Sequence, residues 1–144
     1  MISEAHWFYW ALLSAVFAAL MAIFAKVGLE GVDSDFATLL RVLILIAPLA
    51  VFVAGAGKWR DPLTLAPKTW LFLTLSALAT GASWICYFRA LKMGEASKVA
   101  PVDKLSLVLV AVFAALFLHE RPAVRDWIGI ALVAGGVFIL GFKK

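Results

Sequence analysis

The sequence predicts an all-α integral membrane protein, a bundle of five transmembrane helices, and three observations support this. First, 65% of the residues are hydrophobic, 15% are charged and the mean hydropathy is +1.01, whereas a soluble domain is about half apolar and about a quarter charged. Second, the apolar residues form five long runs separated by short polar connections. Third, the alternating ten-residue segments of a transmembrane barrel are absent. Backbone groups in lipid need partners within their own segment, so the runs are expected to be helices.

The five predicted helices have the length that a bilayer requires. Each contains roughly 19 to 22 residues, or about 30 Å at 1.5 Å per residue, which matches the hydrocarbon core. We expect them at about residues 7–27, 35–54, 70–91, 99–118 and 124–142, within a single domain that spans residues 1–144. The first run is too long for the core of a signal peptide, so we expect it to be retained.

The connections carry turn and capping residues. Gly28 and Gly31 follow the first helix, as is typical of helix ends. The candidate caps of the second helix are Asp33, Ser34 and Asp35. Pro101 is expected in the first turn of the fourth helix, where its missing N–H costs little.

The distribution of basic residues leaves the orientation in the membrane open. An odd number of spans places the termini on opposite sides. The N-terminal side carries five basic residues, Lys58, Arg60, Lys68, Arg121 and Arg125. The other side carries six, Lys26, Arg89, Lys92, Lys98, Lys143 and Lys144, with Arg41 and Lys104 embedded in helices entered from that side. This bias is weak by the positive-inside rule. Either the chain inserts in both orientations, which permits an antiparallel homodimer equivalent to an inverted repeat, or a local detail sets one orientation.

Asp103 and Lys104 form a charged pair near the start of the fourth run. Adjacent helical residues point about 100° apart, so the two side chains are not expected to face one another well. Charges within an apolar span are costly. Either Lys104 extends to the lipid headgroups, or one of the two lines a polar vestibule and contacts the substrate or a coupling proton.

Arg41 lies about two turns inside the second helix and also has two interpretations. On the first, it extends to the lipid headgroups or pairs with Asp33 or Asp35 and anchors the connection. On the second, it joins a basic mouth that would favour anionic or zwitterionic solutes. The residues of that mouth would be Lys26, Arg41, Arg89 and Lys104.

Aromatic and hydroxyl side chains share faces of the first and third helices. Spacings of three and four residues place Trp10, Ser14 and Phe17 on one face, and Thr80, Trp84 and Tyr87 on another. Such faces either line a cavity for an amphipathic or aromatic solute or pack against other helices. On the first interpretation, these six residues and Lys104 form the substrate site, with Arg41, Arg89 and Asp103 at its polar end.

Several functions lack support in the sequence. It contains no metal-ligand cluster, no nucleophile–base set, no nucleotide-binding motif and no nucleic-acid motif. We therefore expect no enzyme activity, no cofactor, no metal and no nucleic-acid partner. Cys86 is the single cysteine, which excludes an internal disulfide.

Three segments resemble an EamA domain of the drug/metabolite transporter superfamily. They are A-K-V-G-L-E-G-V-D-S-D-F-A-T-L-L-R, Y-F-R-A-L-K-M-G-E-A-S-K-V-A-P-V-D-K-L-S and H-E-R-P-A-V-R-D-W-I-G-I-A-L-V-A-G-G-V-F-I-L. Lys26 and Arg41 match the Lys that ends the first helix of such a domain and the Arg early in its second helix. Most members carry two such domains as inverted repeats. The resemblance therefore implies that two antiparallel copies are needed, and that the first, third and fourth helices line the cavity.

The resemblance also leaves the coupling mechanism open. The four-helix small multidrug resistance relatives use a Glu embedded in their first helix, and the corresponding helix here has none, so Asp103 is the nearest substitute. The predicted function is secondary transport or export of small organic solutes across the cell membrane, by alternating access in an antiparallel dimer. The alternatives are a non-transporting structural subunit and a half-transporter that needs a different partner chain.

Overall fold

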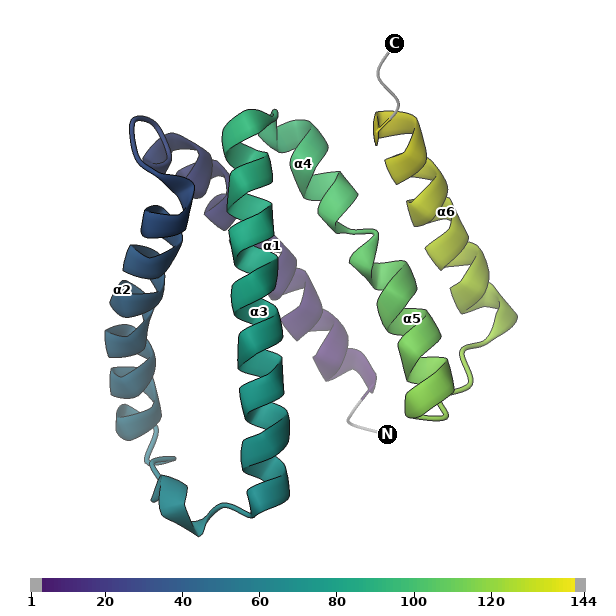
Figure 1. The fold of residues 1–144 in the computed structure, drawn as a ribbon. Helices are drawn as coiled ribbons and strands as arrows, with labels where there is room; N and C mark the ends of the chain where they lie inside the picture. The colour runs from purple at the N-terminus through teal and green to yellow at the C-terminus, as the bar shows by residue number, and fades with distance from the viewer. Residues whose placement is uncertain (1–3, 142–144) are drawn as a thin grey trace. The chain divides into compact units, whose positions relative to one another are not determined.

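The computed structural model describes residues 4–141, and within them every regular element is a helix (Figure 1). The elements are α1 (Glu4–Gly28), α2 (Ser34–Gly55), the 3₁₀ turn η1 (Pro62–Thr64), α3 (Pro67–Met93), α4 (Ala96–Asp103), α5 (Ser106–Phe117) and α6 (Val124–Gly141). Five segments are long and apolar enough to cross a membrane: Trp7–Gly28, Ser34–Gly55, Pro67–Met93, Ala96–Phe117 and Val124–Gly141. The predicted all-α architecture is confirmed. The predicted end of the last helix, at residue 142, lies outside the described residues.

The fourth predicted helix differs from the expectation of one unbroken element. It starts at Ala96 and is interrupted between Asp103 and Ser106. At the interruption the backbone bonds shorten to the 3₁₀ pattern, with the Lys104 N–H donating to the Pro101 carbonyl (2.9 Å) and the Leu105 N–H to the Val102 carbonyl (3.0 Å). The expected place of Pro101 in the first turn was wrong, because the helix begins five residues before it. Pro101 therefore leaves a carbonyl of α4 without its usual helical donor.

The chain forms two compact units, which we describe one at a time. The first comprises residues 25–92 and contains the last turn of α1, the helix α2, the turn η1 and most of α3. Helices α2 and α3 run in opposite directions, joined by the segment that contains η1 (Figure 1). The Asp61 side chain accepts from the Leu63 N–H at 2.9 Å, and the Trp70 indole N–H donates to the Pro62 carbonyl at 3.1 Å. These bonds fix the connection at the start of α3.

The second unit holds residues 4–24 and 93–141 of the described chain. Helices α4 and α5 follow one another and both lie against α6. His119 adopts a positive φ of 56°, which ends α5 and lets the Glu120 N–H reach the Ala114 carbonyl at 3.2 Å. The Asp126 carboxylate accepts from the Ala123 N–H at 2.8 Å, which satisfies a donor at the start of α6.

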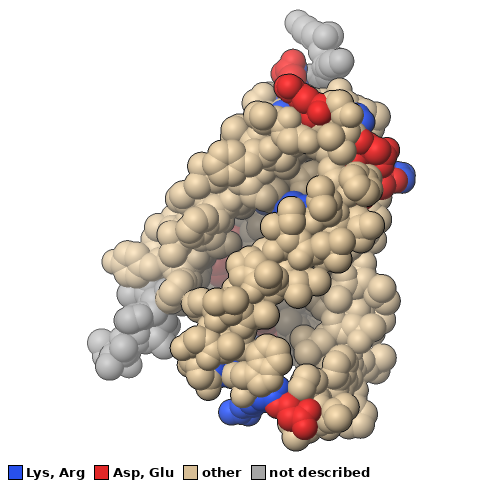
Figure 2. All heavy atoms as spheres, turned by 90° about the vertical axis from the view of Figure 1, so that its left-hand side faces the viewer, with Lys and Arg blue, Asp and Glu red and all other residues tan. Residues whose placement is uncertain are grey.

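Most apolar side chains of both units lie on the surface. Only seven described residues are buried: Ala22, Leu29, Ser34, Thr38, Phe88, Leu91 and Val137. Charged side chains gather at the ends of the helices, and the surface between them is largely uncharged (Figure 2). An apolar surface of this extent is stable in lipid or against another protein surface, and it would not remain exposed in water.

Candidate functional site

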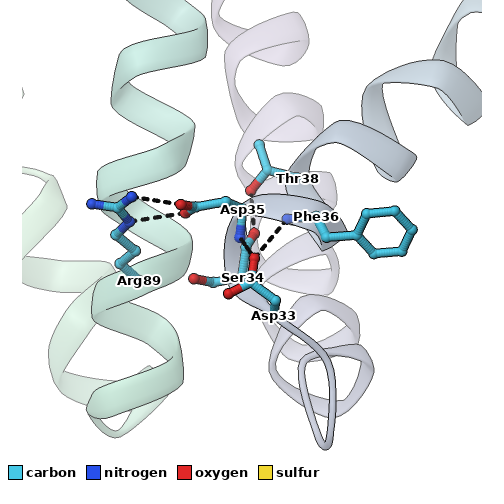
Figure 3. Close-up of polar contacts among 6 residues, drawn as sticks. All are labelled: Asp33, Ser34, Asp35, Phe36, Thr38 and Arg89. Atoms are coloured by element: carbon cyan, nitrogen blue, oxygen red, sulfur yellow. Dashed lines mark hydrogen bonds and ion pairs between the residues drawn. The ribbon is translucent and has the colours of Figure 1, made fainter.

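Asp33 anchors the start of α2. Its backbone is extended, and its Oδ1 accepts from the N–H groups of Asp35 and Phe36, both at 3.0 Å (Figure 3). These are two of the donors that a helix N-terminus leaves without partners. One turn on, the buried Thr38 hydroxyl donates to the Ser34 carbonyl at 2.7 Å. The capping role expected of this segment is therefore confirmed, and Asp33 performs it.

Asp35 joins α2 to the last turns of α3. Arg89 Nε donates to Asp35 Oδ1 at 2.8 Å, and Arg89 Nη2 donates to Asp35 Oδ2 at 2.5 Å (Figure 3). This is the parallel two-bond geometry in which arginine binds carboxylates most specifically. Both members of the pair are on elements of the same unit. The pair fixes the register of α3 against the first turn of α2.

Two lysines satisfy backbone carbonyls at the same end of this unit. Lys26, in the last turn of α1, donates to the Leu91 carbonyl at 2.7 Å, and Lys92 donates to the Val32 carbonyl at 2.5 Å. The Leu91 carbonyl lies in the last turn of α3, where carbonyls lack helical partners and cations are favoured. Lys26 therefore acts as a cap supplied by another helix.

The buried residues of this unit lie at the same end as the polar contacts. Leu29, Ser34, Thr38, Phe88 and Leu91 come from the end of α1, the start of α2 and the end of α3, and each exposes 7% or less of its surface. Buried apolar side chains and satisfied polar groups together restrict local motion. This end, which we call the platform, thus contains all the buried residues of the unit formed by residues 25–92.

Arg41 of α2 contacts two aromatic side chains of α3, one of them the buried Phe88 of this platform. Its guanidinium carbon lies 4.4 Å from the centre of the Trp84 ring and 4.9 Å from that of Phe88, both on α3. Arginine over an aromatic face is a favourable cation–π contact. One terminal nitrogen, Nη1, is buried and has no hydrogen-bond acceptor. The site therefore holds a positive charge with a buried donor atom, Nη1, that has no acceptor among the described residues.

The structure brings together some of the predicted site residues and gives others local partners. Arg41 and Trp84, which the sequence placed in different groups, are in contact. The expected pairing of Arg41 with Asp33 or Asp35 does not form, because Asp33 caps α2 and Asp35 binds Arg89. Phe88 was not predicted as a site residue, although its position four residues after Trp84 places both rings on one face of α3.

The other predicted site residues are as follows. Lys104 Nζ and Asp103 Oδ2 form an ion pair at 3.5 Å, contrary to expectation. The Thr80 hydroxyl donates to the Ser76 carbonyl of its own helix at 2.9 Å, and Tyr87 makes an edge contact with Phe88. Trp10, Ser14 and Phe17 are exposed on α1. Their substrate-binding roles stay predictions. Lys143 and Lys144, counted for orientation, lie outside the described residues.

No metal site is evident in the described part of the chain. Residues 4–141 bring together no group of three or more His, Cys, Asp or Glu side chains that could hold a metal ion.

Comparison with known proteins places the chain in a family. The model of the EamA-like transporter family matches residues 5–142. The chain belongs to this family. Together with the five apolar helices, EamA membership makes it a multi-pass protein of the cell membrane and a transporter of the drug/metabolite type.

Three relatives differ in how much of their own length this chain matches. An uncharacterized transporter in the cobO 3' region of Sinorhizobium sp is 54% identical over 93% of this chain and 95% of its own length. The uncharacterized transporter YvbV of Bacillus subtilis is 28% identical over 93% of this chain but only 44% of its own length. The probable 4-amino-4-deoxy-L-arabinose-phosphoundecaprenol flippase subunit ArnE of Escherichia coli O45:K1 is 32% identical over 74% of this chain and 91% of its own length. No solved structure gives a significant match to the chain.

Proposed function

We propose that this EamA protein is a secondary transporter of small organic solutes that works by alternating access as an antiparallel homodimer. The observation that carries the proposal is the match in length. The chain accounts for 44% of the Bacillus relative yet nearly the whole of the Sinorhizobium one. A unit that makes up about half of a longer transporter requires a second unit to complete a passage.

The five spans and the charge distribution support an antiparallel pair. Five crossings place the two ends of one copy on opposite faces of the membrane. The basic residues, five on one side and six on the other, give little preference for either orientation. Two oppositely inserted copies would reproduce the inverted symmetry on which alternating access depends.

The proposed solute site contains the aromatic and hydroxyl residues of α1 and α3 together with Lys104. Its members are Trp10, Ser14, Phe17, Thr80, Trp84, Tyr87 and Lys104, with Arg41, Arg89 and Asp103 as its polar end. The place of Lys104 at a 3₁₀ interruption supports its inclusion, because such irregular stretches within a span are frequently functional hinges.

A half-transporter that needs a different partner chain is a second candidate. The relative from Escherichia coli is named as a subunit of a flippase. If the same holds here, the purified chain alone would carry no flux, and a second five-helix chain would restore it.

Uptake into liposomes that contain only this protein tests the proposal. We expect flux of at least one solute from a panel of organic anions, zwitterions and cations. The variant Lys104→Ala should keep its thermal stability and lose most of that flux, since it removes the charge at the interruption of the fourth span. Lys68→Ala, at an exposed position in the first turn of α3, is the matched control and should transport normally.

Two outcomes would contradict this account. Wild-type flux in Lys104→Ala would remove Lys104 from the site. An absence of flux for every solute with this chain alone would exclude the homodimeric transporter, and recovery after addition of a second chain would establish the half-transporter.

A further inference from the structure

We infer that Arg41, held against Trp84 and Phe88, is the group that binds an anionic phosphate or carboxylate on the ligand of this protein. The inference depends on the proposed function for its role in transport, because it names the chemical class of the solute. All three residues belong to the unit formed by residues 25–92.

The geometry around Arg41 holds its guanidinium against two rings, a contact that does not use its N–H donors. Arg41 is the eighth residue of α2, about 10 Å along the helix from Ser34 at 1.5 Å per residue. Its guanidinium lies over the rings of Trp84 and Phe88, at 4.4 and 4.9 Å. The N–H donors of a guanidinium lie in its own plane, so contact with aromatic faces does not use them.

The hydrogen bonding of Arg41 is incomplete. Nη1 is buried and has no acceptor among the described residues. Burying a charged donor without an acceptor is costly, and a span that retains such a residue in lipid is a candidate functional site. An anionic oxygen at Nη1 would give this donor an acceptor and would balance the positive charge.

The other cations on this platform already have oxygen partners. Arg89 binds Asp35 through two hydrogen bonds, Lys26 donates to the Leu91 carbonyl and Lys92 donates to the Val32 carbonyl. The nearest acids along α2 are also engaged, since Asp33 caps the helix and Asp35 binds Arg89. Arg41 thus differs from these neighbouring cations because its Nη1 has no oxygen acceptor.

The surroundings also indicate what the anionic group is attached to. Trp84 and Tyr87 are half-buried on the same helix as Phe88. If a ligand oxygen binds Nη1, the rest of the ligand would therefore lie against aromatic side chains. A phosphate or carboxylate carried by an apolar or aromatic body fits both features. The phosphate of an anionic lipid headgroup shares this chemistry with a solute, and the experiment below distinguishes the two.

The first arm of the test uses wild-type protein in an uncharged detergent and measures the thermal unfolding temperature. The probes are phenyl phosphate, benzoate, benzyl alcohol and benzylamine, with ionic strength held constant. Because a ligand that binds only folded protein raises its stability, we expect phenyl phosphate and benzoate to raise the unfolding temperature in a saturable way. Benzyl alcohol and benzylamine should leave it unchanged. Equal shifts with all four probes, or shifts only with benzylamine, would overturn the inference without any variant.

The second arm uses substitutions at Arg41. In Arg41→Gln the phenyl phosphate concentration for half-maximal stabilisation should rise about tenfold or more, as expected for loss of a charge-assisted pair. Arg41→Lys should recover only part of the effect, because lysine keeps the charge but lacks the planar fork. The matched control Arg60→Gln, at an exposed loop position, should respond as the wild type does. Unchanged binding in a folded Arg41→Gln variant would overturn the inference.

The third arm asks whether the anion belongs to a lipid or to a solute. It also distinguishes failure of the anion site from failure of the proposed transport function. Stabilisation by phosphatidylglycerol over phosphatidylcholine that is lost in Arg41→Gln would identify a lipid phosphate as the ligand, and stabilisation by phenyl phosphate alone would identify a solute. Flux in liposomes is measured on the same samples. If the protein transports cations and Arg41→Gln leaves that flux unchanged, the anion site is refuted and the transporter function is kept. If anions bind in an Arg41-dependent way but no solute is transported, the transport function is refuted and the anion site is kept.

Discussion

Neighbouring charged residues at one end of residues 25–92 perform different tasks because their partners differ. Asp33 directs its carboxylate at backbone N–H groups, Asp35 at Arg89, and Arg41 lies against two rings. The cap at Asp33 was predictable because a cap depends on the next three residues of the chain, whereas Asp35, also a candidate cap, binds Arg89 instead. The partner of Arg41 was not, because it depends on which face of α3 turns toward α2, and the sequence of α2 does not contain that information.

The cap at Asp33 gives a prediction at this scale. Replacing Asp33 with Ala should lower the free energy of unfolding by about 1 kcal/mol, because the N–H groups of Asp35 and Phe36 lose their acceptor. Asp33→Asn keeps a side-chain oxygen as acceptor, so it should lower the free energy of unfolding by only a small part of that amount. Reversible unfolding in mixed micelles measures both variants. An Asn variant as unstable as the Ala variant would show that charge, and not the hydrogen bonds, stabilises this end.

At the scale of the element, the long helices were predictable and the interruption was not. Each of the five spans is decided locally by about 20 consecutive apolar residues, and the observed bounds differ from the expected ones by a few residues at most positions. The interruption after Asp103 consists of a change from α-helical to 3₁₀ hydrogen bonds over a few residues. The same residues can form either hydrogen-bond pattern, so composition does not distinguish the two.

The interruption predicts a local difference in amide hydrogen exchange. The amides of Lys104, Leu105 and Leu107 donate to carbonyls three residues back, and such bonds have poorer geometry than those of an α-helix. Peptides covering residues 101–108 should therefore exchange faster than those covering 110–117 of α5. Mass spectrometry on protein in micelles makes the comparison, with the interior of α6 as the slow control. Equal protection on both sides of the interruption would show that the fourth span behaves as one rigid helix.

At the scale of the whole molecule, the central claim is that one copy supplies half of a symmetric passage. Its support is the number of spans, the balance of basic residues and the match to 44% of a longer relative. The solute site predicted from α1, α3 and Lys104 was inferred from faces of single helices and from family resemblance. Faces of single helices do not specify how helices from two copies assemble, which is why the sequence predicts candidate residues better than it predicts a complete site.

The orientation of the chain in its native membrane tests this claim most directly. In a Cys86→Ser background, single cysteines are introduced at Leu63 and Ser97, which are exposed and uncharged, so that the balance of basic residues is kept. Leu63 lies before the start of α3 and Ser97 lies after its end, so this one span separates the two positions. In intact cells a membrane-impermeant maleimide should label about half of the copies at each position, with the remainder labelled after permeabilisation. Complete labelling at one position and none at the other would establish a single orientation and contradict the antiparallel homodimer.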